Sequence, residues 1–159
     1  MSRAFVKESD GDDPGALPER RISQHPNLVT ARGLRLIEEQ IARLEAEYAT
    51  ARAADDRAAI AHLSRDLRYW SARRASAQLA PPPAGAGKVA FGVRVTIEDA
   101  EGEQRSYRLV GEDEADPAEG RISWFAPIAR ALAGREVGDI VAGPRGEFEI
   151  LEIEPASET

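Results

Sequence analysis

Two adjacent carboxylates, Asp55 and Asp56, have the residue type and spacing best suited to chemistry in this chain. They lie between two runs of helix-forming residues, where the hydrophobic pattern stops. Carboxylate oxygens are hard ligands that suit Mg²⁺. An aspartate at this place also suits the N-cap of a following helix, where the helix dipole favours a negative charge. The sequence leaves both interpretations open, a metal-directed pair and a helix cap.

Other kinds of catalytic or metal site have little material in this sequence. The 159 residues include no cysteine, and the two histidines are His25 and His62. Disulfides, thiol nucleophiles and Cys-ligated zinc are thereby excluded, and a histidine triad has few candidates. No apolar run approaches the roughly 20 residues of a membrane helix, and the N-terminus lacks the pattern of a secretory signal. We therefore expect a cytoplasmic protein with no membrane partner.

The charge of the chain is uneven. Twenty-eight acidic and 21 basic residues give a net charge of −7, which argues against a general DNA-binding protein. Residues 57–87 are the exception, because they hold five arginines and one aspartate. Within them, Arg65 and Arg68 are candidates for facing RNA. The alternative is an ordinary solvated helix face.

Two helical segments must position the aspartate pair. Thr30 is a suitable N-cap for the first. Apolar residues then recur at alternating spacings of three and four, the pattern of a coiled-coil seam: Leu34, Ile37, Ile41, Leu44, Tyr48 and Ala51. After the aspartates the pattern restarts in a new phase with Ile60, Leu63, Leu67, Trp70 and Ala77. Two such seams joined by a few residues predict an antiparallel helical hairpin about 35 Å long, with the aspartates at its tip.

Composition divides the rest of the chain. Residues 1–29 lack periodicity and predict a disordered arm, 30–79 form the hairpin, and 80–87, rich in Pro and Gly, are a linker. From residue 88 the apolar pattern has period two, which predicts strands over 89–97, 104–110, 122–124, 138–142 and 148–153. Pro127 to Leu132 is a short predicted helix. Residues 88–154 are thus an antiparallel sheet with one helix, and 155–159 are a tail; the fold class is α+β.

Several motifs, in the same order, resemble the transcript-cleavage factors of the Gre family, GreA and GreB. Their sequences are Thr30-x-x-Gly33, Val89-Ala90-Phe91-Gly92, the stretch from Tyr107 to Asp116, Ile122-Ser123, the stretch from Pro127 to Leu132, and Gly138-Asp139. The resemblance covers residues 30–154. It implies a coiled-coil hairpin followed by a C-terminal domain with an FKBP-like core.

The resemblance also implies a partner and a role. Gre factors bind bacterial RNA polymerase and place the hairpin in its secondary channel. Acidic tip residues there help to hold a second Mg²⁺, and the polymerase cleaves the 3′ end of backtracked RNA. Such a protein is not itself an enzyme; it meets nascent RNA indirectly and is expected to be a monomer. The resemblance implies tip carboxylates Asp55 and Asp56, with Asp56 on the metal, and a polymerase-binding set of Asp113, Ala126, Pro127, Ile128 and Arg130.

Ala59 departs from the family pattern and opens an alternative. Asp56 matches the family's tip aspartate, but Ala59 stands where a second acid is expected three residues later. A protein of the same shape could therefore occupy the channel without cleavage and compete with active factors. Two further alternatives are a prolyl isomerase, because the core is FKBP-like, and a short-hairpin regulator of nucleoside diphosphate kinase. The isomerase would need an aromatic-lined pocket, and the regulator a shorter hairpin.

Overall fold

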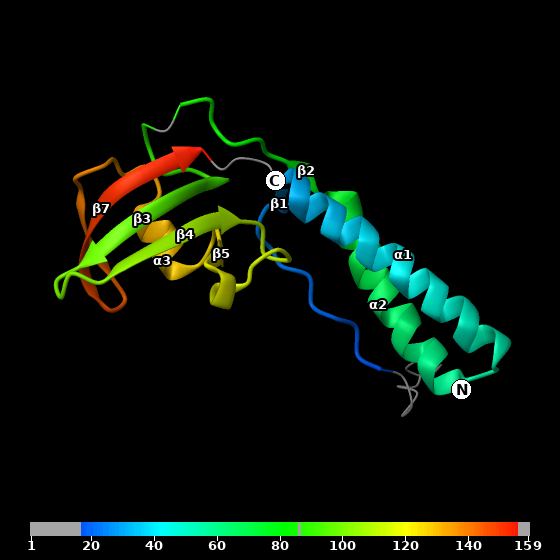
Figure 1. Ribbon diagram of the computed structural model, residues 1–159. Coiled ribbons are helices and arrows are strands. Elements are labelled where there is room, and N and C mark those ends of the chain that lie inside the picture. The colour runs from blue at the N-terminus through cyan, green and yellow to red at the C-terminus, as the bar shows by residue number, and fades with distance from the viewer. Residues whose placement is uncertain (1–16, 86, 156–159) are drawn as a thin grey trace, which may run out of the picture.

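The computed structural model describes residues 17–155 except residue 86. It has a helical hairpin at one end and a curled sheet at the other (Figure 1). The hairpin consists of α1 (Ala31–Ala53) and α2 (Arg57–Ser76). The sheet holds five strands: β3 (Val93–Asp99), β4 (Gln104–Val110), β5 (Arg121–Ser123), β6 (Ile140–Gly143) and β7 (Gly146–Pro155). The predicted α+β class is confirmed.

The hairpin forms where its caps and apolar seam predict it. Thr30 caps α1, because its side chain accepts a hydrogen bond from the Gly33 backbone N–H at 2.9 Å. The buried residues of α1 fall on one face: Gly33, Ile37, Leu44 and Ala51. The apolar residues of α2 are only half-buried, since a two-helix hairpin has no third layer to cover them. Within the described residues, neither helix is long and apolar enough to cross a membrane.

The sheet has the order β5-β4-β3-β7-β6. All neighbours are antiparallel except β4 and β5, which run parallel. Helix α3 (Pro127–Leu132) covers one face, and a short 3₁₀ helix, η1 (Pro117–Glu119), precedes β5. The core lies between α3 and the sheet and is built mainly of β-branched residues such as Val93, Val95 and Ile150.

One predicted strand begins later than its sequence pattern suggested. The alternation from Val89 to Ile97 predicted continuous strand, but β3 begins at Val93. Gly92 has φ +87°, a left-handed conformation that favours glycine, and its N–H donates to the Leu109 carbonyl at 2.8 Å. The chain therefore turns at Gly92. Val89 reaches the core from a loop, with its side chain 2% exposed.

Residues 17–29 differ from the disordered arm that the sequence predicted. They run beside α2 toward the hairpin base (Figure 1). There β1 (Leu28–Val29) pairs in parallel with β2 (Gln78–Leu79). Composition misjudged this segment because its order comes from contacts with distant residues rather than from a periodic pattern. Residues 1–16, the other part of the predicted arm, lie outside the described residues, as do four of the five tail residues.

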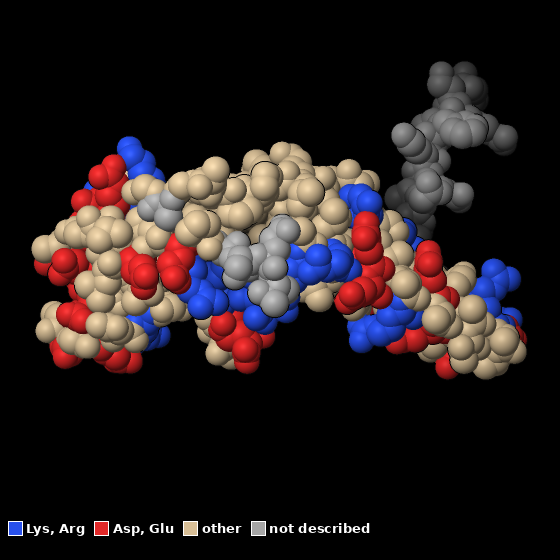
Figure 2. Space-filling model, turned by 45° about the horizontal axis from the view of Figure 1, so that its top comes forward, with Lys and Arg blue, Asp and Glu red and all other residues tan. Residues whose placement is uncertain are grey.

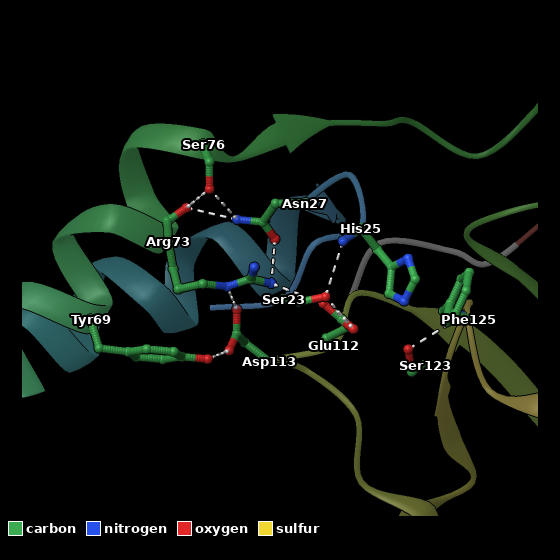
Figure 3. Close-up of polar contacts among 10 residues, drawn as sticks. All are labelled: Ser23, His25, Asn27, Tyr69, Arg73, Ser76, Glu112, Asp113, Ser123 and Phe125. Atoms are coloured by element: carbon green, nitrogen blue, oxygen red, sulfur yellow. Dashed lines mark hydrogen bonds and ion pairs between the residues drawn. The ribbon is translucent and has the colours of Figure 1, made fainter. Parts of the chain in front are cut away.

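A buried arginine, Arg73 of α2, joins the hairpin to the sheet domain (Figure 3). Its side chain is 2% exposed. Nε donates to Asp113 Oδ2 at 2.5 Å, and Nη2 donates to Asn27 Oδ1 at 2.7 Å and lies 3.5 Å from Glu112 Oε2. Asn27 Nδ2 donates in return to the Arg73 carbonyl at 2.7 Å. One guanidinium thus connects α2, the N-terminal segment and the loop after β4.

That loop, residues 111–116, is acidic. Its three successive carboxylates contact the N-terminal segment and the base of the hairpin. Glu112 accepts from the Ser23 hydroxyl at 3.0 Å, and Asp113 accepts from the Tyr69 hydroxyl at 2.8 Å. Burial and the bond to Asp113 raise the pKa of Tyr69 to about 12, so the hydroxyl stays protonated as a donor. Glu114, 5% exposed, contacts Thr30 and Arg32 at the start of α1.

Glu114 fixes the start of α1. One carboxylate oxygen accepts from the Thr30 hydroxyl at 2.5 Å, and the other pairs with Arg32 Nη1 at 3.1 Å. A Cβ at Gly33 would lie 2.7 Å from Glu114 Oε2, so a side chain there would push this carboxylate away from its present position. The motif residues Thr30 and Gly33 therefore serve the junction as well as the helix.

We predict that Arg73→Ala lowers the free energy of unfolding by about 3–5 kcal/mol, because it removes the cationic partner of the largely buried Asp113 carboxylate and leaves it only the bond from Tyr69. Arg74→Ala is the matched control: Arg74 is an exposed neighbour that pairs with Glu38, so its loss should cost at most about 1 kcal/mol. Urea denaturation followed by circular dichroism measures both. Equal losses would show that Arg73 behaves as a surface residue.

We also predict that Leu44→Ala, in the seam of α1, lowers the free energy of unfolding by about 2–5 kcal/mol, because Leu44 is 5% exposed and its removal leaves a cavity. Leu79→Ala removes the same atoms from a side chain that is 57% exposed. Its cost should stay below about 1 kcal/mol. The same denaturation experiment applies, and a loss for Leu44→Ala as small as that of the control would refute the predicted seam.

Candidate functional site

The turn at the hairpin tip has a geometry set by Asp55. The Asp56 N–H donates to the Ala51 carbonyl at 3.0 Å, and the Asp55 N–H donates to the Arg52 carbonyl at 3.2 Å. This is the pair of bonds of a Schellman motif, in which the residue after the C-cap is left-handed. Asp55 takes that position with φ 51°, which aspartate tolerates better than most residues. The tip is therefore a closed turn.

Asp56 begins the second helix as its N-cap. Its Oδ1 accepts from the Ala59 backbone N–H at 3.0 Å. Both aspartates are exposed, and Asp56 Oδ2 and the Asp55 carboxylate have no hydrogen bond to the described residues. The two side chains can thus offer oxygen ligands outward, which fits the one or two protein carboxylates that Mg²⁺ usually takes. Among the described residues, no group of three or more metal-ligating side chains occurs.

The basic residues predicted to face RNA are engaged with acids. Arg65 donates to its neighbour Asp66 at 3.3 Å, and Arg68 Nη2 pairs with Glu19 at 2.5 Å. The hydrogen bond from Arg68 lowers the pKa of Glu19, and both side chains are exposed. Arg20, next in the N-terminal segment, lies over the Tyr69 ring at 3.8 Å from its centre. The segment before the hairpin thus covers part of the basic face of α2.

The predicted polymerase-binding residues fall in two places. Ala126, Pro127, Ile128 and Arg130 lie together at the start of α3, with Pro127 and Arg130 exposed and Ala126 and Ile128 half-buried. Asp113 does not join them. Its side chain is 11% exposed and is used by Arg73 and Tyr69. The structure therefore gives Asp113 a role in holding the hairpin, which the sequence did not predict.

Phe125 anchors the turn before α3. Its ring stacks on that of His25 with centres 3.3 Å apart, as Figure 3 shows, and the Arg130 guanidinium lies 5.0 Å from its centre. The N-terminal segment therefore also reaches the edge of this surface.

A hollow of about 520 Å³ lies beside the start of α3. Apolar and aromatic side chains line part of it, and charged residues line the rest: Ile97, Tyr107, Ile122, Ile128 and Phe148, with Asp99, Glu101, Glu103, Arg105, Arg145 and Glu147. Such a hollow can accept an apolar side chain of a partner. Tyr107 and Phe148 are its two aromatic residues.

Sequence reasoning missed the residues of the junction, above all Arg73, Glu112 and Glu114. A signal was present: three consecutive acids directly after a buried strand need partners if the loop is not fully exposed. The partners could not be named from sequence, because Arg73 lies about 40 residues away beside the seam.

The C-terminal domain is similar in sequence to a domain of known proteins. Residues 83–155 match the family model "Transcription elongation factor, GreA/GreB, C-term". Transcription elongation factor GreA of Methylococcus capsulatus is 53% identical over 72 residues, which are 42% of this chain and 46% of that protein. Transcription elongation factor GreB of Yersinia pestis is 51% identical over 77 residues, 46% of this chain and 45% of that protein. The matched region spans less than half the length of these curated relatives.

A solved structure, that of the GreA factor homolog 1 protein of Thermus thermophilus, is 22% identical and covers 82% of this chain and 99% of that one, with a TM-score of 0.39. That score is too low to compare the two architectures. The family model and the two relatives agree with the motifs between Val89 and Gly138, and the resemblance seen in the sequence is confirmed. Residues 83–155 of this chain thus match the C-terminal domain of the GreA/GreB transcription elongation factors.

Proposed function

We propose that this chain binds bacterial RNA polymerase through its C-terminal domain, places its hairpin in the secondary channel, and so regulates transcription elongation in the cytoplasm. The observation that carries the proposal is a domain that matches the GreA/GreB C-terminal domain and is joined to a hairpin with an acidic tip by two ion pairs, Arg73–Asp113 and Arg32–Glu114. The first helix has 23 residues and a length of about 35 Å. Because the base of the hairpin is held by these contacts, binding of the sheet domain to polymerase would set the position of the hairpin tip.

The start of α3 is the proposed contact with polymerase. It offers an exposed proline, a half-buried isoleucine and an exposed arginine on one short helix, beside the hollow at Ile128. An apolar anchor with a charged rim is the usual composition of a protein interface. Arg65 and Arg68 would approach RNA only if their bonds to Asp66 and Glu19 open.

The tip would act on the polymerase rather than as an enzyme by itself. Asp56, with Asp55 beside it, would hold one Mg²⁺ jointly with the polymerase, which must supply the remaining ligands. Bound there, the ion would stabilise charge during hydrolysis of backtracked RNA. The Schellman turn and the N-cap bond fix where these carboxylates lie.

A second candidate is a factor that enters the channel without promoting cleavage. It is favoured by Ala59, which offers only a backbone N–H, and by Asp56, one of whose oxygens is already used by that N–H. Such a protein would bind polymerase and exclude active factors.

Cleavage is tested with backtracked elongation complexes that carry 3′-labelled RNA. If the chain stimulates cleavage, Asp56→Asn should abolish release of short products, because it removes the charge but keeps an N-cap residue. Asp56→Ala would also weaken the cap by about 0.5–2 kcal/mol. Asp55→Asn should have a smaller effect. A wild type that binds but releases nothing selects the second candidate.

Ala59→Glu supplies the matched gain of function. It adds a carboxylate one helical turn from Asp56 on the same face. We expect it to raise cleavage in either case, with affinity for polymerase unchanged. Binding by both proteins with cleavage by neither would contradict a metal-directed role for the tip.

The docking surface is tested with Ile128→Arg, which places a charge in the proposed apolar contact and should weaken binding to polymerase at least tenfold, since an unpaired buried charge costs more than about 1.4 kcal/mol. Ile140→Arg is the matched control, because Ile140 is 67% exposed on β6. Surface plasmon resonance with immobilised polymerase measures both. Normal binding by folded Ile128→Arg would place the interface elsewhere.

A further inference from the structure

Three arginines form a row across the outer face of the sheet. In the register of the strands Arg94 of β3 lies opposite Arg108 of β4, and Arg108 lies beside Arg121 of β5. Neighbouring strands are about 4.8 Å apart, so the row brings three like charges within about 10 Å. Like charges on directly paired positions destabilise a sheet. The fold therefore gains nothing from this arrangement, which calls for another explanation.

The row lines a hollow of about 330 Å³. Arg32, from the first turn of α1, adds a fourth guanidinium, and the remaining lining residues are Ser106, Glu119 and Gly120. The hollow therefore draws on the hairpin base, three strands and the segment before β5. It shares no residue with the proposed polymerase contact at α3 or with the tip.

Within the described residues, the nearby acids pair with only two of the four arginines, Arg32 and Arg121. Glu114 pairs with Arg32, and Asp116 lies 3.4 Å from Arg121 Nη2. In the part of the chain that the structure describes, Arg94 and Arg108 make no ion pair, although Glu119 lines the hollow and Glu154 lies opposite Arg94 in the register with β7. The chain as a whole carries a net charge of −7, so a cluster of four arginines is a local exception.

Two donors in the row lack acceptors. The Nε atoms of Arg108 and Arg121 are buried and have no hydrogen-bond partner among the described residues. Buried polar groups in folded proteins nearly always have partners, and an exception calls for an explanation, of which a bound water or ion is one. The two residues are register partners, and both line the hollow.

We propose that this hollow is a binding site for phosphate groups, either of a free phosphate compound or of a single-stranded nucleic-acid backbone. Guanidinium groups present planar pairs of donors that match the oxygens of phosphate, and several arginines can surround one tetrahedral anion. Phosphate oxygens would accept from the guanidinium groups that line the hollow and offset the repulsion within the row. This proposal goes beyond elongation-factor activity and does not rest on it.

The test uses the full chain in buffer without divalent cations. Inorganic pyrophosphate is titrated by calorimetry, and a fluorescein-labelled single-stranded oligouridylate by fluorescence anisotropy. We expect at least one to bind, and Arg108→Gln to weaken that binding about tenfold or more, since hydrogen bonds to charged groups are strong. Arg135→Gln is the matched control, because Arg135 is exposed and lies outside the hollow. It should change affinity less than twofold, roughly the effect of a distant surface charge.

Each outcome has a defined meaning. Binding of pyrophosphate assigns the site to free phosphates, and binding of the oligonucleotide alone assigns it to a phosphodiester backbone. In the second case Arg108→Gln should also reduce the slope of log affinity against log salt by about one. Absence of binding by both probes, equal losses in Arg108→Gln and Arg135→Gln, or equally tight binding of a poly-glutamate peptide would overturn the proposal. If Arg108→Gln does not fold, the exposed Arg94→Gln is used in its place with the same expectation.

Discussion

The buried guanidinium of Arg73 is the interaction on which the rest of the structure depends. A two-helix hairpin has a single seam, and it cannot hold its own orientation relative to a separate sheet domain. Arg73 provides that hold, because it contacts Asp113 of the acidic loop and Asn27 of the N-terminal segment at once. A buried ion pair is not a large net source of stability, but it has strict geometry, and losing either partner is costly. We therefore infer that the pair contributes more to the angle of the hairpin than to the stability of the fold.

At each end of the hairpin, one residue both caps a helix and makes a second interaction or offers a free oxygen. Thr30 caps α1 and also donates to Glu114 of the sheet domain. Asp56 caps α2 and also presents a free oxygen at the tip. Residues that define helix ends are thus those that connect the helices to something else. Figure 2 shows basic side chains near the middle of the viewed face, with acidic side chains beside them.

The sequence predicted the elements well where local signals determine them. Both helix caps, the seam of α1, strand β4 and α3 follow from periodicity and end signals, and each is present. The start of β3 was wrong because Val89 has the period of a strand but enters the core from a loop. The path of residues 17–29 was missed because it depends on Asn27 and Ser23 meeting partners 46 to 89 residues away.

The roles of single residues were harder to predict from the sequence than the helices and strands. Asp113 was grouped with the surface at α3, since both lie in segments that resemble the Gre family. In the structure Asp113 is held by Arg73 and Tyr69, and its role in binding polymerase stays a prediction. The arginine row was invisible in the sequence, where its members are 13 or 14 positions apart and meet only through strand pairing.

The distance between the hairpin tip and the sheet domain in solution tests whether the Arg73 ion pair fixes the hairpin. Because the chain has no cysteine, spin labels can be attached to cysteines introduced at two exposed positions, Ala53 and Val137, and the distance distribution measured by double electron–electron resonance. We expect one narrow distribution that broadens when Arg73 is replaced by alanine and stays narrow when Arg74 is replaced. A broad distribution in the otherwise unaltered protein would contradict the central claim that the buried ion pair fixes the hairpin.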